Sequence, residues 1–91
     1  LKNQDSAFYY FDLAVADDST NYSLLNNYSY YLALADTNLN KALTMIKRVI
    51  KQFPENQTYL DTYAWVLYKN NNFGEALRII DLAVKNGGNT S

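Results

Sequence analysis

Residues 59–77, YLDTYAWVLYKNNNFGEAL, contain the pattern that decides the fold. The large apolar residues of the first half recur at a spacing of three and four, at Leu60, Tyr63 and Leu67. This spacing is typical of one face of an α-helix. Ala64 lies beside the apolar stripe and Ala76 follows the polar NNN turn, so two helices can approach closely at these small residues. The stretch therefore predicts a helical hairpin with a tight polar turn.

The composition is that of one globular domain. The chain has 91 residues, of which 48% are hydrophobic and 19% charged, so it has enough apolar residues for a core and is unlike a disordered chain. The formal net charge of −1 provides no overall basic field for a phosphate backbone, so we expect no nucleic-acid partner. No apolar run approaches the roughly 18 residues needed to cross a bilayer, so we expect no membrane insertion by this segment.

Side chains suited to catalysis or metal binding are scarce. Histidine and cysteine are absent, which removes the usual general base, the commonest neutral metal ligand and the thiol nucleophile. The carboxylates are scattered over turns and helix surfaces, without the pairing that acid–base catalysis needs or the ligand-dense loop that calcium needs. The sequence therefore predicts no catalytic residue, no cofactor and no metal site, and it predicts that the protein is not an enzyme.

The hairpin has partial copies elsewhere in the chain. Residues 25–32 (LNNYSYYL) match residues 60–67 (LDTYAWVL) at a separation of 35, and 41–46 (KALTMI) match 75–80 (EALRII) at a separation of 34. The upstream segment 7–15 (AFYYFDLAV) repeats the pattern of the second pair, with alanine in the same column. Repetition at this period is typical of a helical solenoid, in which each unit buries its apolar face against a neighbour.

These patterns predict five helices, at about residues 5–16, 21–35, 39–52, 57–70 and 73–86. The third should stop before Pro54, because the pyrrolidine ring disfavours continuation of a helix. Asn56 is a good N-cap for the fourth helix, and the asparagines at 70–72 tolerate the left-handed backbone of a tight turn. Gly87 and Gly88 should close the fifth helix, leaving residues 89–91 to fray.

The repeat pattern resembles the tetratricopeptide repeat family, in which a large residue, a leucine-small pair and an aromatic precede a second helix marked by alanines and a closing proline. The matching positions are Leu60, Tyr63, Ala64, Leu67, Ala76, Ile80 and Ala83 in the last repeat, and Leu25, Tyr28, Ser29, Leu32, Ala42, Ile46, Val49 and Pro54 in the middle one. The departures are the missing tryptophan in the first position, Ser29 at a small position, and Gly88 where proline is expected. The stretches LNNYSYYLAL and YLDTYAWVLYKNNNFGEAL look like the C-terminal repeats of a longer bacterial member.

The resemblance implies an all-α fold, a right-handed superhelical alpha-alpha repeat of five helices and about two and a half repeats. The expected single domain, 1–91, divides into the second helix of a truncated repeat, two full repeats and a tail, at 5–20, 21–56, 57–88 and 89–91. The chain begins with Leu1 rather than methionine, and we expect it to be a piece of a longer protein. Its compartment is left open between cytoplasm and periplasm.

The resemblance also implies a concave groove lined by the first helix of each repeat. Carried over to this chain, the groove residues are Asn26, Tyr30, Asp61, Trp65, Tyr68 and Lys69. An aromatic step from Tyr30 to Trp65 would hold a peptide, whereas Phe11 and Phe73 are expected in the core. The alternative is that a neighbouring repeat covers these residues. Binding of acidic chaperone tails is not expected, because Asp61 stands where that branch of the family has a base.

The function implied is a non-catalytic protein-protein interaction scaffold that binds a peptide or protein partner in the groove. The alternative is a structural C-terminal cap or self-association module that acts through apolar terminal helices. The first helix and the last are both rich in apolar residues, and we expect both end surfaces to meet a partner, a subunit or missing repeats.

The predicted third helix carries four cations and no acid: Lys41, Lys47, Arg48 and Lys51. We expect these cations to form ion pairs on the convex face, with Lys47 beside Asp12 and Asp81, in preference to forming a nucleic-acid patch.

Overall fold

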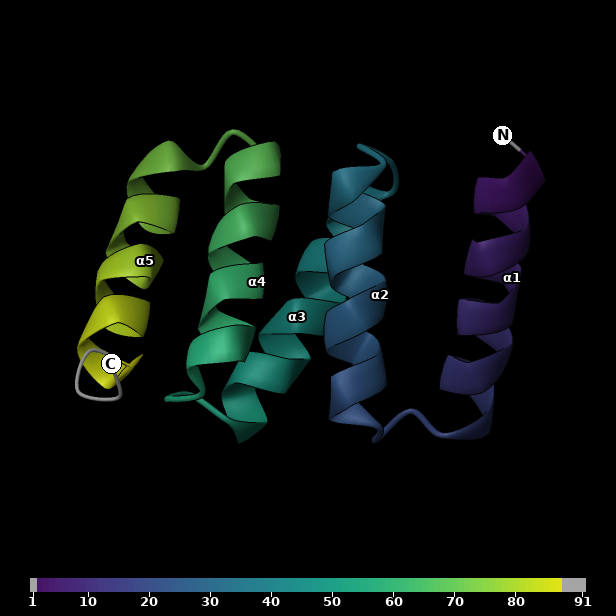
Figure 1. Ribbon diagram of the computed structural model, residues 1–91, viewed down its shortest axis with the longest axis horizontal. Helices are drawn as coiled ribbons and strands as arrows, with labels where there is room; N and C mark the ends of the chain where they lie inside the picture. The colour runs from purple at the N-terminus through teal and green to yellow at the C-terminus, as the bar shows by residue number, and fades with distance from the viewer. Residues whose placement is uncertain (1, 88–91) are drawn as a thin grey trace.

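The computed structural model describes residues 2–87, with side chains from Phe8 to Lys85, and these residues form a row of five helices (Figure 1). The helices are α1 (Lys2–Asp17), α2 (Tyr22–Leu34), α3 (Leu39–Gln52), α4 (Gln57–Lys69) and α5 (Phe73–Gly87). The predicted all-α fold with five helices is confirmed, although α1 begins at Lys2 instead of near residue 5. The predicted closure at Gly88 and the predicted tail 89–91 lie outside the described residues.

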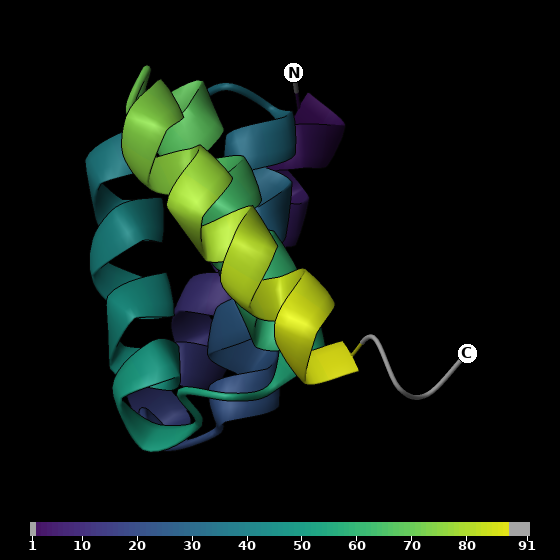
Figure 2. The same cartoon turned by 90° about the vertical axis from the view of Figure 1, so that its left-hand side faces the viewer.

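Each helix packs on the next one along the chain, and α4 also packs on α2. The result is elongated, with extents of 39 × 26 × 22 Å, and α1 and α5 lie at opposite ends of the row (Figure 1). In the same view α2 and α4 run in the same direction. The view along the row shows α3 set to one side of α2 and α4, with α5 crossing α4 at an angle (Figure 2).

Asparagine residues determine several helix ends, as the sequence predicts. The side chain of Asn56 accepts a hydrogen bond of 3.1 Å from the backbone N–H of Tyr59, which satisfies one of the unpaired donors at the start of α4. Asn71, in the turn between α4 and α5, has a positive φ of 66°, a conformation that asparagine adopts more readily than most residues. α3 ends at Gln52, two residues before Pro54.

Replacing Asn56 by alanine is expected to lower the free energy of unfolding by about 1 kcal/mol, because the N–H of Tyr59 loses its acceptor. Urea unfolding followed by circular dichroism measures this loss. The matched control is Asn40→Ala, an exposed position within the first turn of α3, where alanine's higher helix propensity should leave stability unchanged or slightly raised. Equal destabilisation of the two variants would contradict a capping role for Asn56.

The core consists of two adjoining clusters of buried side chains. The first joins α2, α3 and α4 through Leu25, Tyr28, Leu32, Ala33, Ala42, Met45, Ile46, Val49 and Val66. The second joins α4 and α5 through Leu60, Ala64, Leu67, Ala76, Ile79 and Ala83. Most matching positions of the two repeats are buried alike, so the periodicity read from the sequence coincides with the packing. Phe73 and Ile80 are exceptions: the sequence predicts both in the packed positions, but the structure leaves them exposed at the end of the row.

A polar cluster holds α1 against the next two helices. The buried ring of Tyr28 stacks on Phe11 with centroids 4.8 Å apart and an interplanar angle of 7°. The hydroxyl of Tyr28 donates to Asp12 Oδ1 at 2.5 Å, and Lys41 Nζ donates to the same oxygen at 2.7 Å. Asp12 therefore pairs with Lys41, and its expected pairing with Lys47 is wrong. The reason is that the side chain of Lys41, at the start of α3, reaches Asp12 beside the hydroxyl of Tyr28.

The pKa of Asp12 is held below its ordinary value by the hydrogen bond from Lys41 and then by the one from Tyr28. A depressed carboxyl pKa adds stability that is fully present above the unfolded pKa of about 3.9 and is lost as the pH falls toward the lower folded value. We therefore expect Asp12→Asn to be less stable than the parent at pH 7, with a difference that shrinks between about pH 5 and pH 2. The urea concentrations at the unfolding midpoints of the parent chain and of Asp12→Asn, compared across this pH range, measure the difference. A difference that is constant with pH would contradict the ion pair.

Candidate interaction site between helices α4 and α5

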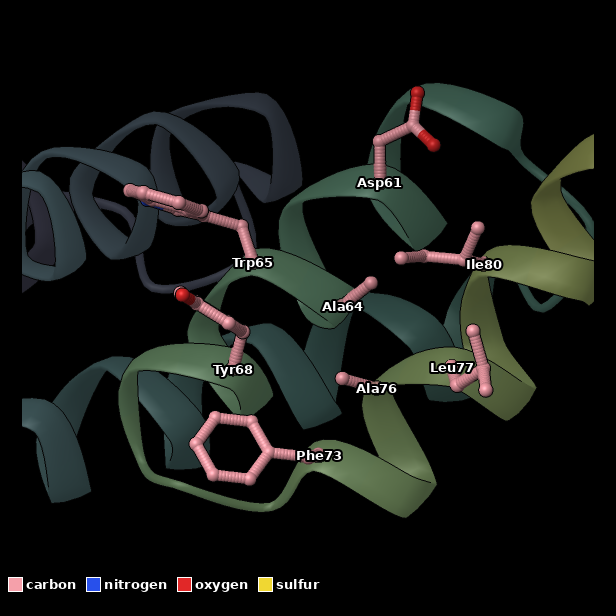
Figure 3. A pocket seen from close by; sticks show the side chains of 8 residues that line it. All are labelled: Asp61, Ala64, Trp65, Tyr68, Phe73, Ala76, Leu77 and Ile80. Atoms are coloured by element: carbon pink, nitrogen blue, oxygen red, sulfur yellow. The ribbon is translucent and has the colours of Figure 1, made fainter.

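A hollow of about 800 Å³ opens between α4 and α5 (Figure 3). Its walls come from both helices and consist of Asp61, Ala64, Trp65, Tyr68, Phe73, Ala76, Leu77 and Ile80. Asp61 is the one charged residue among these eight. The hollow is therefore an apolar surface with a single carboxylate at its edge.

The shape of the hollow follows from the size of the residues on the two helices. Ala64 and Ala76 are buried where α4 and α5 meet, and their small side chains let the helices approach closely. The larger residues on either side, Tyr68, Phe73 and Leu77, stand on the two rims and remain 53%, 56% and 64% exposed. Close packing at the alanines thus produces the concavity, and the rims expose apolar area that no described residue covers.

Aromatic rings form one continuous edge of the hollow. Trp65 and Tyr68 stack with centroids 6.0 Å apart and an interplanar angle of 16°, and Tyr68 meets Phe73 edge to face at 5.4 Å. Lys69 Nζ lies 5.6 Å from the centroid of the Trp65 ring, within the range of a cation–π interaction. Stacking restricts the rotamers of these side chains, so the edge presents a largely preformed surface.

Trp65 differs from its aromatic neighbours because it also belongs to the core. Its half-buried ring packs against the first cluster, and in Figure 3 it points away from α5. Its indole Nε1–H is buried without a hydrogen-bond partner, as are Asn26 Oδ1 and Ser29 Oγ on α2. Trp65 therefore joins the hollow to the α2–α4 packing.

Of the six groove residues that the sequence predicts, the structure gathers three at the hollow: Asp61, Trp65 and Tyr68. Lys69 lies beside it, in a smaller depression that it shares with Asp36, and its Nζ is 3.9 Å from an Asp36 carboxylate oxygen. The two α2 residues lie elsewhere. Asn26 is only 7% exposed, and the ring of Tyr30 meets Tyr31 edge to face. The aromatic step from Tyr30 to Trp65 stays a prediction, and the structure adds a step along α4 from Trp65 to Tyr68.

Besides the two alanines, three lining residues were not among the predicted groove positions: Phe73, Leu77 and Ile80. All three are on α5, which the family pattern assigns to packing. The signal that identifies them is the composition of that helix, whose apolar residues surround more of its circumference than one neighbouring helix can cover.

Within residues 2–87, no group of three or more carboxylates is arranged to hold a metal ion, and no helix is long and apolar enough to span a membrane. Comparison with known proteins found no matching family model, no similar curated protein and no similar solved structure. The class of the protein is therefore described from its own fold and site. It is an all-α domain of five sequentially packed helices that carries an apolar, aromatic-edged hollow at one end of the row.

Proposed function

We propose that this chain is a non-catalytic protein-interaction module of tetratricopeptide type, and that the hollow between α4 and α5 receives part of a protein partner. The observation that carries the proposal is the continuous exposed apolar surface of Tyr68, Phe73, Leu77 and Ile80 around a concavity of about 800 Å³. A large contiguous apolar patch on a protein surface commonly marks a site of interaction with another molecule.

The repeat architecture supports the family part of the proposal. The two hairpins α2–α3 and α4–α5 bury the same columns of the sequence pattern, including Leu25 with Leu60 and Ala42 with Ala76. α4 packs on both helices of the preceding hairpin, as a stack of repeats requires. On this proposal the row is about two and a half repeats of a right-handed superhelix, and α1 is the second helix of the first, incomplete one.

Each part of the hollow has a distinct role in the proposed binding. Tyr68 and Phe73 provide rigid aromatic area, which contributes much of the binding energy at many interfaces. Leu77 and Ile80 extend the apolar wall along α5, and Asp61 selects a partner that offers a cation. The groove of the proposal is therefore shifted from α2 and α4 to α4 and α5.

Selection of random peptides displayed on phage against the immobilised chain tests the proposal. We expect selected peptides to lose at least tenfold in affinity for Tyr68→Ala, which corresponds to truncation of an interface hot spot. The control is Tyr10→Ala, an exposed tyrosine on α1 at the far end of the row. Peptides that bind Tyr68→Ala as tightly as the parent chain, or a selection that yields no specific binder, would refute the proposal.

A second candidate, self-association through the end faces, is favoured by the exposure of Tyr9, Tyr10 and Leu13 on α1. They lie four or fewer residues apart on α1, which is at the opposite end of the row from α4 and α5 (Figure 1). Size-exclusion chromatography with light scattering distinguishes the two functions. A dimer that Leu13→Asp converts to a monomer supports assembly through α1, whereas a monomer at high concentration argues against it.

A further inference from the structure

The hollow between α4 and α5 can be compared with the equivalent surface of the preceding hairpin, α2–α3. A shift of 35 residues in the first helix and 34 in the second relates each lining residue to a residue of the α2–α3 hairpin. The counterparts are Asn26, Ser29, Tyr30, Ala33, Leu39, Ala42, Leu43 and Ile46. In the α2–α3 hairpin most of this surface is covered, because α4 packs over both helices, and among the counterparts only Tyr30 is exposed.

The exposure of matched residues shows what the covering helix does. Ile46 is fully buried, whereas its counterpart Ile80 is 44% exposed. Ala33 is fully buried, whereas its counterpart Tyr68 is 53% exposed. Among the residues that the structure describes, no helix occupies on α4 and α5 the place that α4 occupies on α2 and α3. The hollow is thus the position of one absent helix.

The way α4 docks shows which features such a helix needs. Val66 of α4 belongs to the core cluster of α2 and α3, and Tyr63 packs against the same cluster one turn earlier. At the C-terminal end of α4, Asn70 Nδ2 lies 3.4 Å from the carbonyl oxygen of Leu39, at the start of α3. An apolar stripe with a polar end therefore fits this kind of groove.

The hollow differs from its counterpart in one chemical respect. Asp61 provides a carboxylate where the α2–α3 hairpin has the neutral amide of Asn26. Asn26 is buried under the packed helices, so a helix docked in the same way would also remove Asp61 from water. A desolvated carboxylate is costly unless a cation pairs with it.

We infer that the hollow binds an amphipathic helix of a partner protein, docked on α4 and α5 as α4 is docked on α2 and α3, with a lysine or arginine facing Asp61. The inference rests on the proposed function and specifies its partner. Helices with apolar residues at i, i+3, i+4 and i+7 commonly bind in such grooves. Because α2 and α4 run in the same direction, the bound helix runs parallel to α4, and its cation lies in its N-terminal half (Figure 1).

The charge of α1 argues against α1 of a second copy as the occupant. The exposed apolar residues of α1 are accompanied by Asp12 and Asp17, and the one cation of α1, Lys2, is its first residue. Docking of α1 from another copy would therefore place carboxylates near Asp61. A basic partner helix meets the requirement that α1 does not.

The probe for the experiment is a synthetic peptide with the sequence of residues 56–70, which is the helix that fills the matching groove. It carries a fluorophore and the change Trp65→Phe, so that Trp65 of the protein is the only tryptophan in the sample. Two cationic forms add Thr58→Lys or Thr62→Lys, one turn apart. A fourth form carries Tyr63→Pro, which breaks the helix while keeping most side chains. Anisotropy of the fluorophore gives the affinity, and tryptophan emission reports binding at the hollow.

We expect at least one cationic peptide to bind about threefold to tenfold more tightly than the unmodified form, as a partly desolvated ion pair allows. Asp61→Asn in the protein should abolish that preference and let the unmodified peptide bind at least as tightly as before, because no carboxylate then loses its water. Leu77→Asp should weaken every form at least tenfold, whereas Leu13→Asp, the same change at an exposed leucine on α1, should change none.

Several results would overturn the inference. A proline-containing peptide that binds as well as the helical ones would show that the occupant is not a helix. A cationic preference that persists in Asp61→Asn would remove the role of the carboxylate, and a dimer that depends on Leu77 would make the occupant a second copy. The proposed function is tested separately by the selected peptides. If these peptides depend on Tyr68 but do not compete with any helical peptide, the proposed function stands and the helical occupant is refuted.

Discussion

Tyr28→Ala is expected to lower the free energy of unfolding by about 3–5 kcal/mol, which is a large part of the stability of a small domain. Tyr28 is 1% exposed and is the largest fully buried side chain described. Its removal opens a cavity against Phe8 and Phe11 and leaves Asp12 with one hydrogen-bond partner fewer. The loss therefore combines apolar burial, ring stacking and a charge-assisted hydrogen bond.

Tyr28→Phe separates these contributions, because it keeps the ring and removes the hydroxyl. We expect it to cost about 1–2 kcal/mol, since Lys41 still pairs with Asp12. Tyr30→Ala on the same helix, which is 40% exposed, should cost less than about 1 kcal/mol. Urea unfolding gives all three values, and hydrogen exchange should show that α1 loses protection first. Equal losses in the free energy of unfolding for Tyr28→Ala and Tyr30→Ala would contradict the role of Tyr28 as a core residue.

Trp65→Ala is expected both to lower the free energy of unfolding by about 2–4 kcal/mol and to abolish binding at the hollow. A residue that only lined a groove could be removed with little loss of stability. Trp65 does more than that, because its partly buried ring packs against the first core cluster and its Nε1–H is buried. Loss of binding by this variant is therefore not evidence for a contact with a partner.

Trp65→Phe is the informative companion variant. It retains an aromatic ring beside Tyr68 and removes the buried Nε1–H that has no hydrogen-bond partner, so we expect a stability loss of less than about 1.5 kcal/mol. Binding to the hollow should persist within about threefold. Thermal unfolding and peptide anisotropy measure the two effects. A stability for Trp65→Ala equal to that of the parent chain would show that the ring is not part of the core.

Local features of this fold could be predicted well from the sequence. Asn56, Pro54 and the asparagine turn mark helix ends through interactions that span only a few residues, and the structure confirms them. The apolar columns also gave the correct buried faces in the interior of the row, as Leu25 and Leu60 show. A residue that contacts its own helix or the next one is determined by spacing, which is visible in the chain.

The candidate site was less predictable, because exposure depends on which helix lies on top. Ile46 and Ile80 occupy equivalent positions in the pattern, yet α4 covers one and leaves the other open. Asp12 pairs with Lys41 for a similar reason: the ion pair joins residues 29 apart on α1 and α3, and the repeat pattern predicts a different partner. Asp61, Trp65 and Tyr68 were identifiable as groove candidates, whereas their neighbours on α5 were indicated only by the apolar composition of that helix.

The sequence by itself determined the five helices, most of their ends, the two repeating apolar faces and the close approach of α4 and α5 at the alanines 64 and 76, because spacing, capping and side-chain size act locally. Only the tertiary structure decided that the rims beside these alanines stay open to form a hollow. The physical reason is that burial is a property of neighbouring helices. Side chains at equivalent positions of the repeat belong to the core where another helix packs on them, and form an exposed surface where no described helix does.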